Sequence, residues 1–223
     1  MHIKNISFVK TQHMKKQIFT LLLLMASVLG YTQTIDTVIQ TKVYTSYFNY
    51  TLKAPVYITY SLYQGGGDCD RKAFHFLNDI PALKGHIATQ ADYAASGYDE
   101  GHLCNSQDEA GDCSRDQATF RFYNCLPQTK ELNRGIWKTW ETAIRKQSAT
   151  DSLWIITGGT FNGNKTMGKD KVAVPDYCWK VVESETTHQI VEVILCDNTS
   201  TPNCQQISIE ILGPLLPYKL PLK

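Results

Sequence analysis

The chain has 223 residues, of which 43% are hydrophobic and 19% are charged. That length corresponds to one full domain or at most two small ones, and that composition supports a packed core and excludes wholesale disorder. With 22 basic and 21 acidic residues the formal net charge is +1, which argues against a histone-like or ribosomal type of protein. A local basic site stays open, because net charge does not describe how charges are distributed.

The N-terminal segment has the pattern of an export signal. Two lysines follow Met14, and an apolar run then covers 18–30, as in a secretory signal peptide. We predict that 1–32 is an upstream extension plus signal peptide starting at Met14, and that 33–223 is a single domain. The protein would then be secreted or periplasmic, with no membrane anchor after signal cleavage. The alternative is a buried N-terminal helix.

Removal of a signal peptide would change the net charge of the chain, and export would favour disulfide bonds between its cysteines. Four of the lysines and none of the acids lie in the first 32 residues, so the remaining chain carries 18 basic and 21 acidic residues, a net charge of −3. All seven cysteines also lie in that remaining part. An oxidising compartment favours disulfides, and the odd number leaves at least one thiol unpaired or available to another chain.

The predicted elements in chain order are strands interrupted by one long helix. Runs rich in Val, Ile, Tyr and Thr predict strands at 41–50, 55–63, 154–157, 177–183 and 189–196. Residues 92–128 are polar and turn-rich, which predicts short strands with loops. An apolar residue every fourth position from Leu132 to Ile144 predicts a helix over 132–147 with an apolar stripe. The sum is an α+β single domain, with at most a short helix near the proline-rich C-terminus.

The first candidate site is the run Asp99-Glu100-Gly101-His102. A histidine with carboxylates nearby is the usual base near neutral pH, and a glycine before it lets the backbone turn and expose the imidazole. A single histidine is more often an ordinary surface or core residue, so this run alone decides little.

The second candidate runs from Asn124 to Gln128 around Pro127. Its amides could bind phosphate oxygens or orient a ligand. A polar turn explains the same residues equally well.

The third candidate lies on the predicted helix. Asn133, Trp137, Glu141 and Arg145 are spaced by four and share a broad helix face. An asparagine oxygen suits a hard cation, a carboxylate suits its water shell, and a guanidinium suits phosphate. The alternative is a solvated face with an ion pair between Glu141 and Arg145.

Taken in order, the three runs resemble the DNA/RNA non-specific endonuclease family, a group of ββα-metal nucleases. Segments around Arg71 and Phe76, at 92–98, at 155–159 and at 174–180 extend the resemblance over most of 40–213. It implies a ββα-metal nuclease fold with a mixed or antiparallel sheet and one long active-site helix. One departure stands out, because the family's Asp-Arg-Gly-His motif has Glu100 in place of its arginine. An acid there weakens attraction to phosphate.

The resemblance implies roles for the catalytic residues. His102 would be the general base that takes a proton from water, and Asn124 would orient that base or the phosphate. Arg71 and Arg145 would pair with phosphate oxygens.

The resemblance also implies a metal and a substrate. Asn133 would ligate Mg²⁺ or Mn²⁺ directly and Glu141 through water, with Glu100, Gln128 and Arg134 along the substrate path. DNA, RNA or both would be cut with little sequence preference, leaving 5′-phosphates. A homodimer and a protein inhibitor are further expected partners. Two rival functions are a nucleic-acid-binding protein without catalysis and a phosphodiesterase with a narrow small substrate.

The cysteines near His102 allow two interpretations. Cysteine and histidine together suit zinc, whereas export and the absence of a Cys-x-x-Cys pair favour disulfides. We expect a disulfide between Cys196 and Cys204 and a free Cys178, with two further disulfides drawn from Cys69, Cys104, Cys113 and Cys125.

Overall fold

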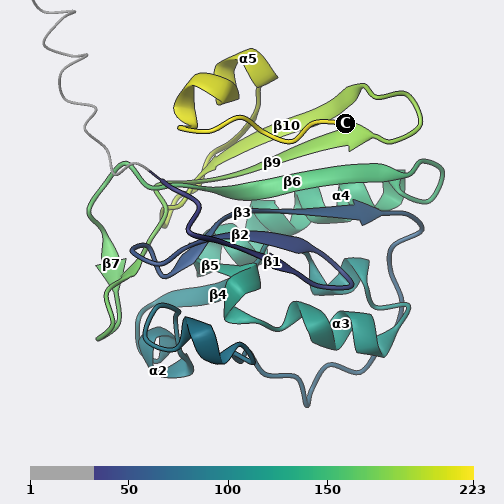
Figure 1. The fold of residues 1–223 in the computed structure, drawn as a ribbon. Helices are drawn as coiled ribbons and strands as arrows, with labels where there is room; N and C mark the ends of the chain where they lie inside the picture. Colours follow the sequence, from purple (N-terminus) through teal and green to yellow (C-terminus); the bar gives the residue numbers. More distant parts are fainter. Residues whose placement is uncertain (1–32) are drawn as a thin grey trace, which may run out of the picture. The chain divides into compact units, whose positions relative to one another are not determined.

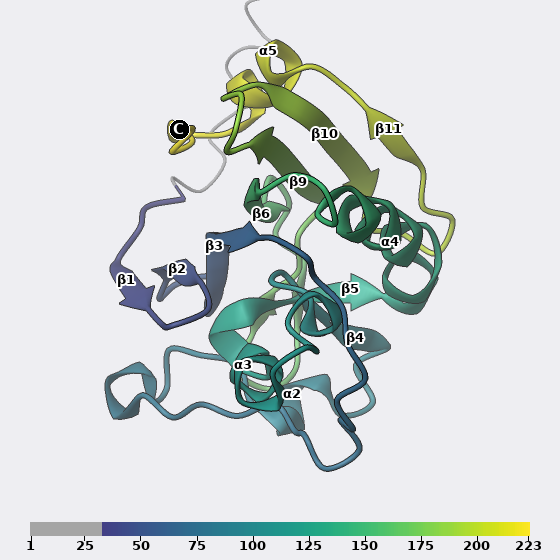
Figure 2. The same ribbon diagram turned by 90° about the vertical axis from the view of Figure 1, so that its right-hand side faces the viewer.

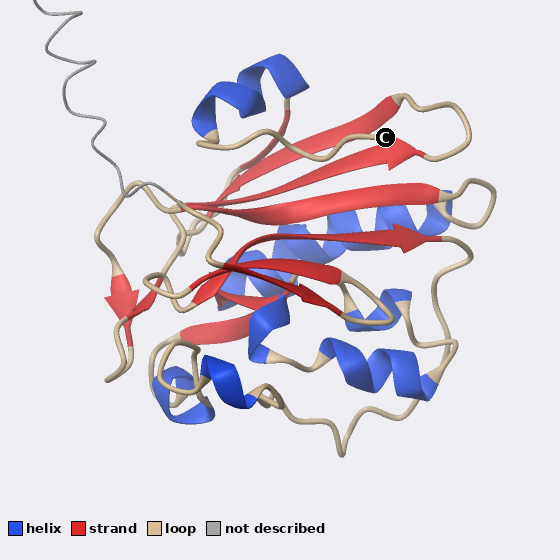
Figure 3. Ribbon diagram, in the orientation of Figure 1, coloured by secondary structure: helices blue, strands red, loops and turns tan. Residues whose placement is uncertain are grey.

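Strands dominate the part of the chain, residues 33–223, that this computed structural model describes. The strands are β1 (Thr37–Gln40), β2 (Thr45–Asn49), β3 (Ala54–Leu62), β4 (Tyr98–His102), β5 (Cys125–Thr129), β6 (Leu153–Thr160), β7 (Thr166–Met167), β8 (Val172–Ala173), β9 (Tyr177–Ser184), β10 (Ile190–Asp197) and β11 (Cys204–Gln206). The helices are α2 (Gln90–Tyr93), α3 (Cys113–Thr119), α4 (Trp137–Gln147) and α5 (Ile209–Leu212), with a π-helical turn at Leu132–Ile136 directly before α4 (Figures 1 and 3).

Seven of these strands form one antiparallel sheet in the order β1-β2-β3-β6-β9-β10-β11. Nearly every residue of its central strands β3, β6 and β9 is buried, as expected for strands covered on both faces. Helix α4 lies against one face (Figure 2). Tyr57 of β3 stacks with Tyr218 of the C-terminal segment, with their ring centroids 5.0 Å apart.

The predicted fold class is confirmed, and so are most of its strands. The two runs at 41–50 and 55–63 pair as the antiparallel strands β2 and β3, with Thr45 opposite Thr59. The three later runs form β6, β9 and β10. The edge strands β1 and β11 were not predicted, because each has only three or four residues and too few positions to show an alternating pattern.

The predicted long helix is interrupted, and its apolar stripe is confirmed only in part, because Leu132 and Ile144 are buried and Ile136 is not. Trp137 donates its backbone N–H to Leu132, five residues back, and Gly135 between them has the non-helical angles φ −102° and ψ −114°. This extra residue in the first turn shifts the face that α4 presents to the sheet. Ile136 is therefore exposed, whereas Trp137 and Glu141 on the predicted polar face are buried.

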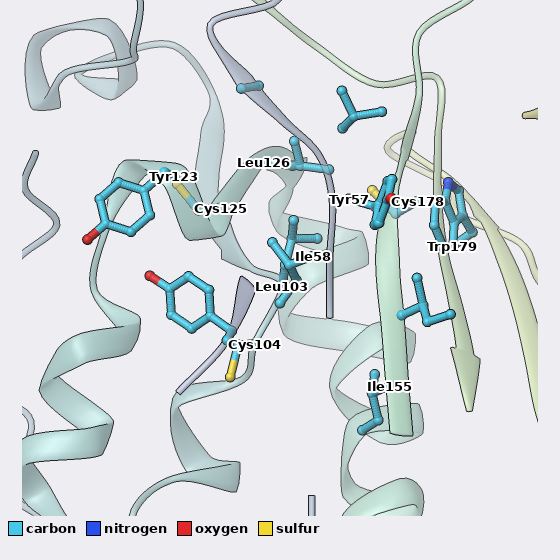
Figure 4. Close-up of a cluster of buried hydrophobic side chains, with 14 of the residues drawn as sticks. Tyr57, Ile58, Leu103, Cys104, Tyr123, Cys125, Leu126, Ile155, Cys178 and Trp179 are labelled. Carbon is cyan, nitrogen blue, oxygen red and sulfur yellow. The ribbon is translucent and has the colours of Figure 1, made fainter. Parts of the chain in front are cut away.

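The candidate site lies in the excursion between β3 and β6, two strands that are neighbours in the sheet. Within it, β4 and β5 form a separate two-stranded ribbon. Leu103 and Leu126 of this ribbon region pack in the same buried cluster as Ile58 and Ile155 of the sheet (Figure 4). The ribbon is thus fixed to the sheet by the hydrophobic core, which holds His102 in a defined place.

The predicted upstream extension and signal peptide at 1–32 fall outside the described residues. Within 33–223, none of the helices has the length and apolar character that a bilayer crossing requires.

Candidate active site

Strand β4 carries Glu100 and His102, and within the described part of the chain β5 is its one pairing partner. The Gln128 side chain from β5 lies directly against Gly101, where an added Cβ would be 2.2 Å from its Oε1. No side chain fits there without displacing Gln128. The glycine is therefore required by packing between the two strands rather than by an unusual turn.

The imidazole of His102 sits against two aromatic rings. Its centroid lies 4.6 Å from that of Phe76 and 4.7 Å from that of Phe120. Nε2 is shielded from solvent and has no hydrogen-bond partner among the described residues. Burial, with a smaller effect from the nearby Arg71 guanidinium, lowers the pKa of His102 to about 3. The imidazole is therefore neutral at ordinary pH, the form that accepts a proton.

Arg71 supplies an exposed positive charge beside His102. Its Nη1 donates to Oγ of Ser106 at 2.7 Å, and that hydroxyl in turn donates to Asp116 at 2.5 Å. The anchor uses one of five N–H donors, so the others stay available for phosphate oxygens.

Asn124 is fully buried and its side chain is occupied by the backbone around it. Its Oδ1 accepts from the N–H of Cys104 at 2.9 Å, and its Nδ2 donates to the carbonyls of Cys104 and Thr119 at 3.0 and 2.8 Å. The amide thus holds the segment directly after His102. The buried amide cannot contact a substrate. Its geometry fits a role in positioning the backbone that follows His102.

Gln128 was expected along the substrate path, but its side chain is turned into the protein. Its side chain is completely buried beneath Gly101, and neither its oxygen nor its nitrogen has a hydrogen-bond partner among the described residues. The alternation along β5 turns it inward, where it fills the space that Gly101 leaves.

Asp99 on β4 is hydrogen-bonded to two residues of the π-helical turn. It accepts two hydrogen bonds of 2.7 Å from Arg134 and one of 3.1 Å from Nδ2 of Asn133. Partial burial would raise the pKa of Asp99, but these donors hold it below its usual value. Because Nδ2 of Asn133 points at Asp99, its Oδ1 is left for another partner.

Glu141 lies inward on α4, between a loop and the sheet. Its Oε2 accepts from Nδ2 of Asn105 at 2.6 Å. Its Oε1 has no hydrogen-bond partner among the described residues and lies 3.8 Å from Nζ of Lys180 on β9. Burial raises the pKa of Glu141, and the Lys180 charge opposes that rise.

Arg145 is held by the protein itself. Its Nε donates to Asp108 and its Nη2 to Asn105, at 2.7 and 2.9 Å. Asp108 also accepts from Tyr60 at 2.9 Å and is buried. Arg145 therefore belongs to a network inside the protein, unlike Arg71.

Residues 27–211 match the sequence description of the DNA/RNA non-specific endonucleases. The chain belongs to this family. Endonuclease G of Homo sapiens is 29% identical over 156 residues, which cover 65% of this chain and 52% of that protein. A nuclease of Nostoc sp. is 37% identical over 95 residues, covering 42% and 34%. The chain thus spans about half, or less, of the length of these curated relatives.

A solved structure shares the fold of this family member. The structure titled as a complex of EndoG with EndoGI, on the mechanism of EndoG inhibition, superposes with a TM-score of 0.70 at 23% identity, covering 79% of this chain and 82% of that one. The predicted ββα-metal nuclease fold is thereby confirmed.

Glu100 lies on β4, two residues before His102. Its carboxylate accepts a hydrogen bond of 2.9 Å from Nε2 of Gln90, the first residue of α2. The acid is partly exposed and is held by a neutral amide instead of a cation. Its negative charge therefore stays effective on the strand that carries His102.

The donor atoms of this family member fit a hydrated Mg²⁺ ion. Asn133 has a free carbonyl oxygen, and Oε1 of Glu141 is buried without a hydrogen-bond partner in the described part. Oxygen donors of this kind, few in number and completed by water, are typical of Mg²⁺ sites. Across 33–223, no group of three or more His, Cys, Asp or Glu side chains is arranged to hold a metal.

The cysteines form two disulfides in the described part, one fewer than expected. Cys196–Cys204 was predicted and is confirmed, as is the free thiol of Cys178, and Cys69–Cys113 is the second bridge. Cys104 and Cys125 stay as buried thiols. The zinc interpretation is wrong, because Cys113 is oxidised and the two neighbouring thiols, whose pKa values burial raises, lie in the core.

Two residues around Glu141 are not marked by the candidate motifs. Asn105 bridges Glu141 and Arg145, and nothing in its local sequence distinguishes it. Lys180 lies at the end of the 174–180 segment that resembles the family. A charged residue within the apolar run Cys-Trp-Lys-Val-Val of a central strand is a usable signal, because a buried lysine requires a partner.

Proposed function

We propose that this protein is an exported, divalent-metal-dependent endonuclease that hydrolyses phosphodiester bonds in DNA and RNA with little sequence preference. The observation that carries the proposal is the neutral imidazole of His102 beside the exposed guanidinium of Arg71. Family membership supports the reaction class. Two disulfides among residues 33–223 support an oxidising destination, in keeping with a signal peptide at 1–32.

The chemistry follows from the charge that develops during hydrolysis. His102 would take the proton of the attacking water, and Arg71 would pair with the phosphoryl oxygens. A bound Mg²⁺ would supply positive charge for those oxygens and for the departing 3′-oxygen. Asn133 would hold that ion directly and Glu141 through water. Loss of the 3′-oxygen leaves the phosphate on the 5′ side.

The other residues would position these groups. Asn124 would fix the backbone after His102, and Asn105 would fix Glu141 and Arg145. Arg134 is mostly exposed and would reach the substrate backbone from its anchor on Asp99. Contacts to phosphates in place of base edges explain cutting with little sequence preference.

The test uses the purified protein with plasmid DNA and with RNA, with and without Mg²⁺ or Mn²⁺, beside His102→Ala. We expect metal-dependent cutting that the substitution lowers by about 10²- to 10⁴-fold. Intact binding without cutting under any metal would instead identify a nucleic-acid-binding protein. Turnover of a small chromogenic phosphodiester without plasmid cutting would identify a narrow phosphodiesterase.

The proposal includes two protein partners. A protein inhibitor is suggested by the shared fold with a chain solved in an inhibitor complex. A homodimer is the second, and light scattering after size-exclusion chromatography would give its mass directly. A monomer mass at every concentration would remove the dimer and leave the nuclease proposal intact.

A further inference from the structure

Lys180 is a fully buried lysine in the middle of the sheet. It lies on β9, opposite Thr157 of β6 and Ile194 of β10, and only 2% of its side chain is exposed. A lysine is almost never buried this far without a partner. The sheet here does more than support α4, because it places a positive charge directly beneath the helix.

The charge of Lys180 belongs to a buried group of two acids and two bases. This charge cluster consists of Asp108, Glu141, Arg145 and Lys180. Arg145 holds Asp108 at 2.7 Å, and Lys180 faces Glu141 at 3.8 Å. Asn105 joins the two pairs through its hydrogen bonds to Glu141 and Arg145.

Lys180 attracts Glu141 without forming a hydrogen bond to it. The 3.8 Å between Nζ and Oε1 exceeds a hydrogen bond, whereas Asn105 holds Oε2 at 2.6 Å. Oε1 is therefore oriented and still free to accept a hydrogen bond. The ammonium also lies 5.2 Å from the ring centroid of Trp137, one helical turn before Glu141, so Lys180 contacts two successive turns of α4.

We propose that Lys180 is a positioning residue for metal binding. Its charge attracts and orients the Glu141 side chain from beneath α4, and the 3.8 Å distance leaves Oε1 without a hydrogen bond from Lys180, so that a water molecule of the hydrated cation can donate to it. This inference rests on the proposed function for the identity of the cation. It goes beyond that function by assigning to the sheet a residue on which the metal's water shell depends, through Glu141.

The test measures Mn²⁺ binding by electron paramagnetic resonance, which needs no catalysis. Lys180→Met keeps length and apolar bulk and removes the charge, and we expect a loss of at least about tenfold in Mn²⁺ affinity. The matched control is Lys219→Met, an exposed lysine in the C-terminal segment, which should bind Mn²⁺ like the unsubstituted protein. We also expect kcat to fall in Lys180→Met while KM for an oligonucleotide is unchanged. A folded Lys180→Met with unchanged Mn²⁺ affinity would overturn the inference.

A double-mutant cycle with Glu141→Gln tests whether Lys180 acts through Glu141. In the Glu141→Gln background, Lys180→Met should change Mn²⁺ affinity less than threefold, because the carboxylate is already gone. Losses that simply multiply would overturn the inference.

The double variant also tests the inference if Lys180→Met does not fold. If Lys180→Met alone does not fold, the double variant removes both charges and should recover a cooperative unfolding transition. A double variant that is as unfolded as the single one would also overturn the inference. If the unsubstituted protein binds Mn²⁺ without cutting nucleic acid, the proposed function fails and this inference stands.

Discussion

The two arginines expected to bind phosphate lie in opposite surroundings. Arg71 is exposed and gives one N–H to a serine, whereas Arg145 is largely buried and donates to a carboxylate and an amide of the protein. The first keeps most of its donors for a ligand, and the second has committed its charge to the fold. Two residues of the same type, predicted for the same task, thus differ in whether their donors are available to a ligand or are used by the protein itself.

The contrast extends to the regions around the two arginines. Near Arg71, the imidazole of His102 is neutral and packed against aromatic rings, with one nitrogen left unpaired in the described part. Near Arg145, two acids and two bases are buried together and joined by Asn105. We therefore expect substitutions in the first region to change activity and those in the second to change stability as well.

The largest expected effect is that of Arg145→Ala, which tests whether Arg145 stabilises the fold. It leaves Asp108 buried without its cation, so the free energy of unfolding should fall by about 3–5 kcal/mol. Urea unfolding followed by tryptophan fluorescence measures this loss. Arg134→Ala is the matched control, because Arg134 is mostly exposed and its ion pair with Asp99 is screened by solvent, so its loss should change the free energy of unfolding much less. Equal losses in the two variants would remove the distinction between scaffold and surface.

Acid should weaken the fold through His102. Its pKa falls from 6.5 in the unfolded chain to about 3 in the folded one, so below pH 6.5 the unfolded chain takes up a proton that the folded protein does not. Stability from this residue is complete above pH 6.5 and is lost as the pH falls toward 3, by about 2 kcal/mol at pH 5. Urea unfolding at pH 7 and pH 5 measures the change, and His102→Asn should show a smaller one. An identical pH dependence in both proteins would contradict the shifted pKa.

Arg71→Ala should lower activity far more than stability. Loss of a charged contact to phosphate costs about 1.5 kcal/mol or more, which is at least tenfold in cleavage. The midpoint of urea unfolding should change little, since Arg71 is exposed. Initial rates of plasmid cutting, set against the rates of Arg145→Ala corrected for its folded fraction, test this. Full activity in Arg71→Ala would place the phosphate elsewhere.

The smallest expected effect is that of Glu100→Arg. Replacing an acid by a base on β4 should tighten DNA binding several-fold and steepen its dependence on salt, because more counterions are released from the nucleic acid. Fluorescence anisotropy of a labelled duplex at several salt concentrations measures both quantities, with Glu100→Gln as the intermediate case. An affinity and a salt dependence that stay unchanged would remove Glu100 from the substrate path.

The sequence predicted most of the fold because the strands have local patterns. The runs that became β3, β6, β9 and β10 were visible from their β-branched and aromatic residues. The face of α4 was not predictable by the same logic. A helical period assumes 3.6 residues per turn, and the π-helical turn around Gly135 breaks that count just before Glu141.

The sequence named candidate site residues, and their exposure was not predictable from it. The motifs single out His102, Asn133 and Glu141 as candidates, but they could not show which polar side chains are turned inward. Gln128 and Asn124 carry amides that suit phosphate as well as the protein backbone, and only packing across β4, β5 and the following loop decides between them.

The position of the site between β3 and β6 has a consequence for how the protein folds. About 90 residues separate two strands that pair side by side, so joining them closes a long loop at a cost on the order of 4 kcal/mol. Such long-range pairing forms slowly relative to local contacts. Lys180 lies on β9, which follows β6 in the chain. During synthesis, Glu141 therefore lacks the opposite charge of Lys180 until most of the chain has been made. Order of synthesis and slow closure together delay the moment at which the assembled site exists.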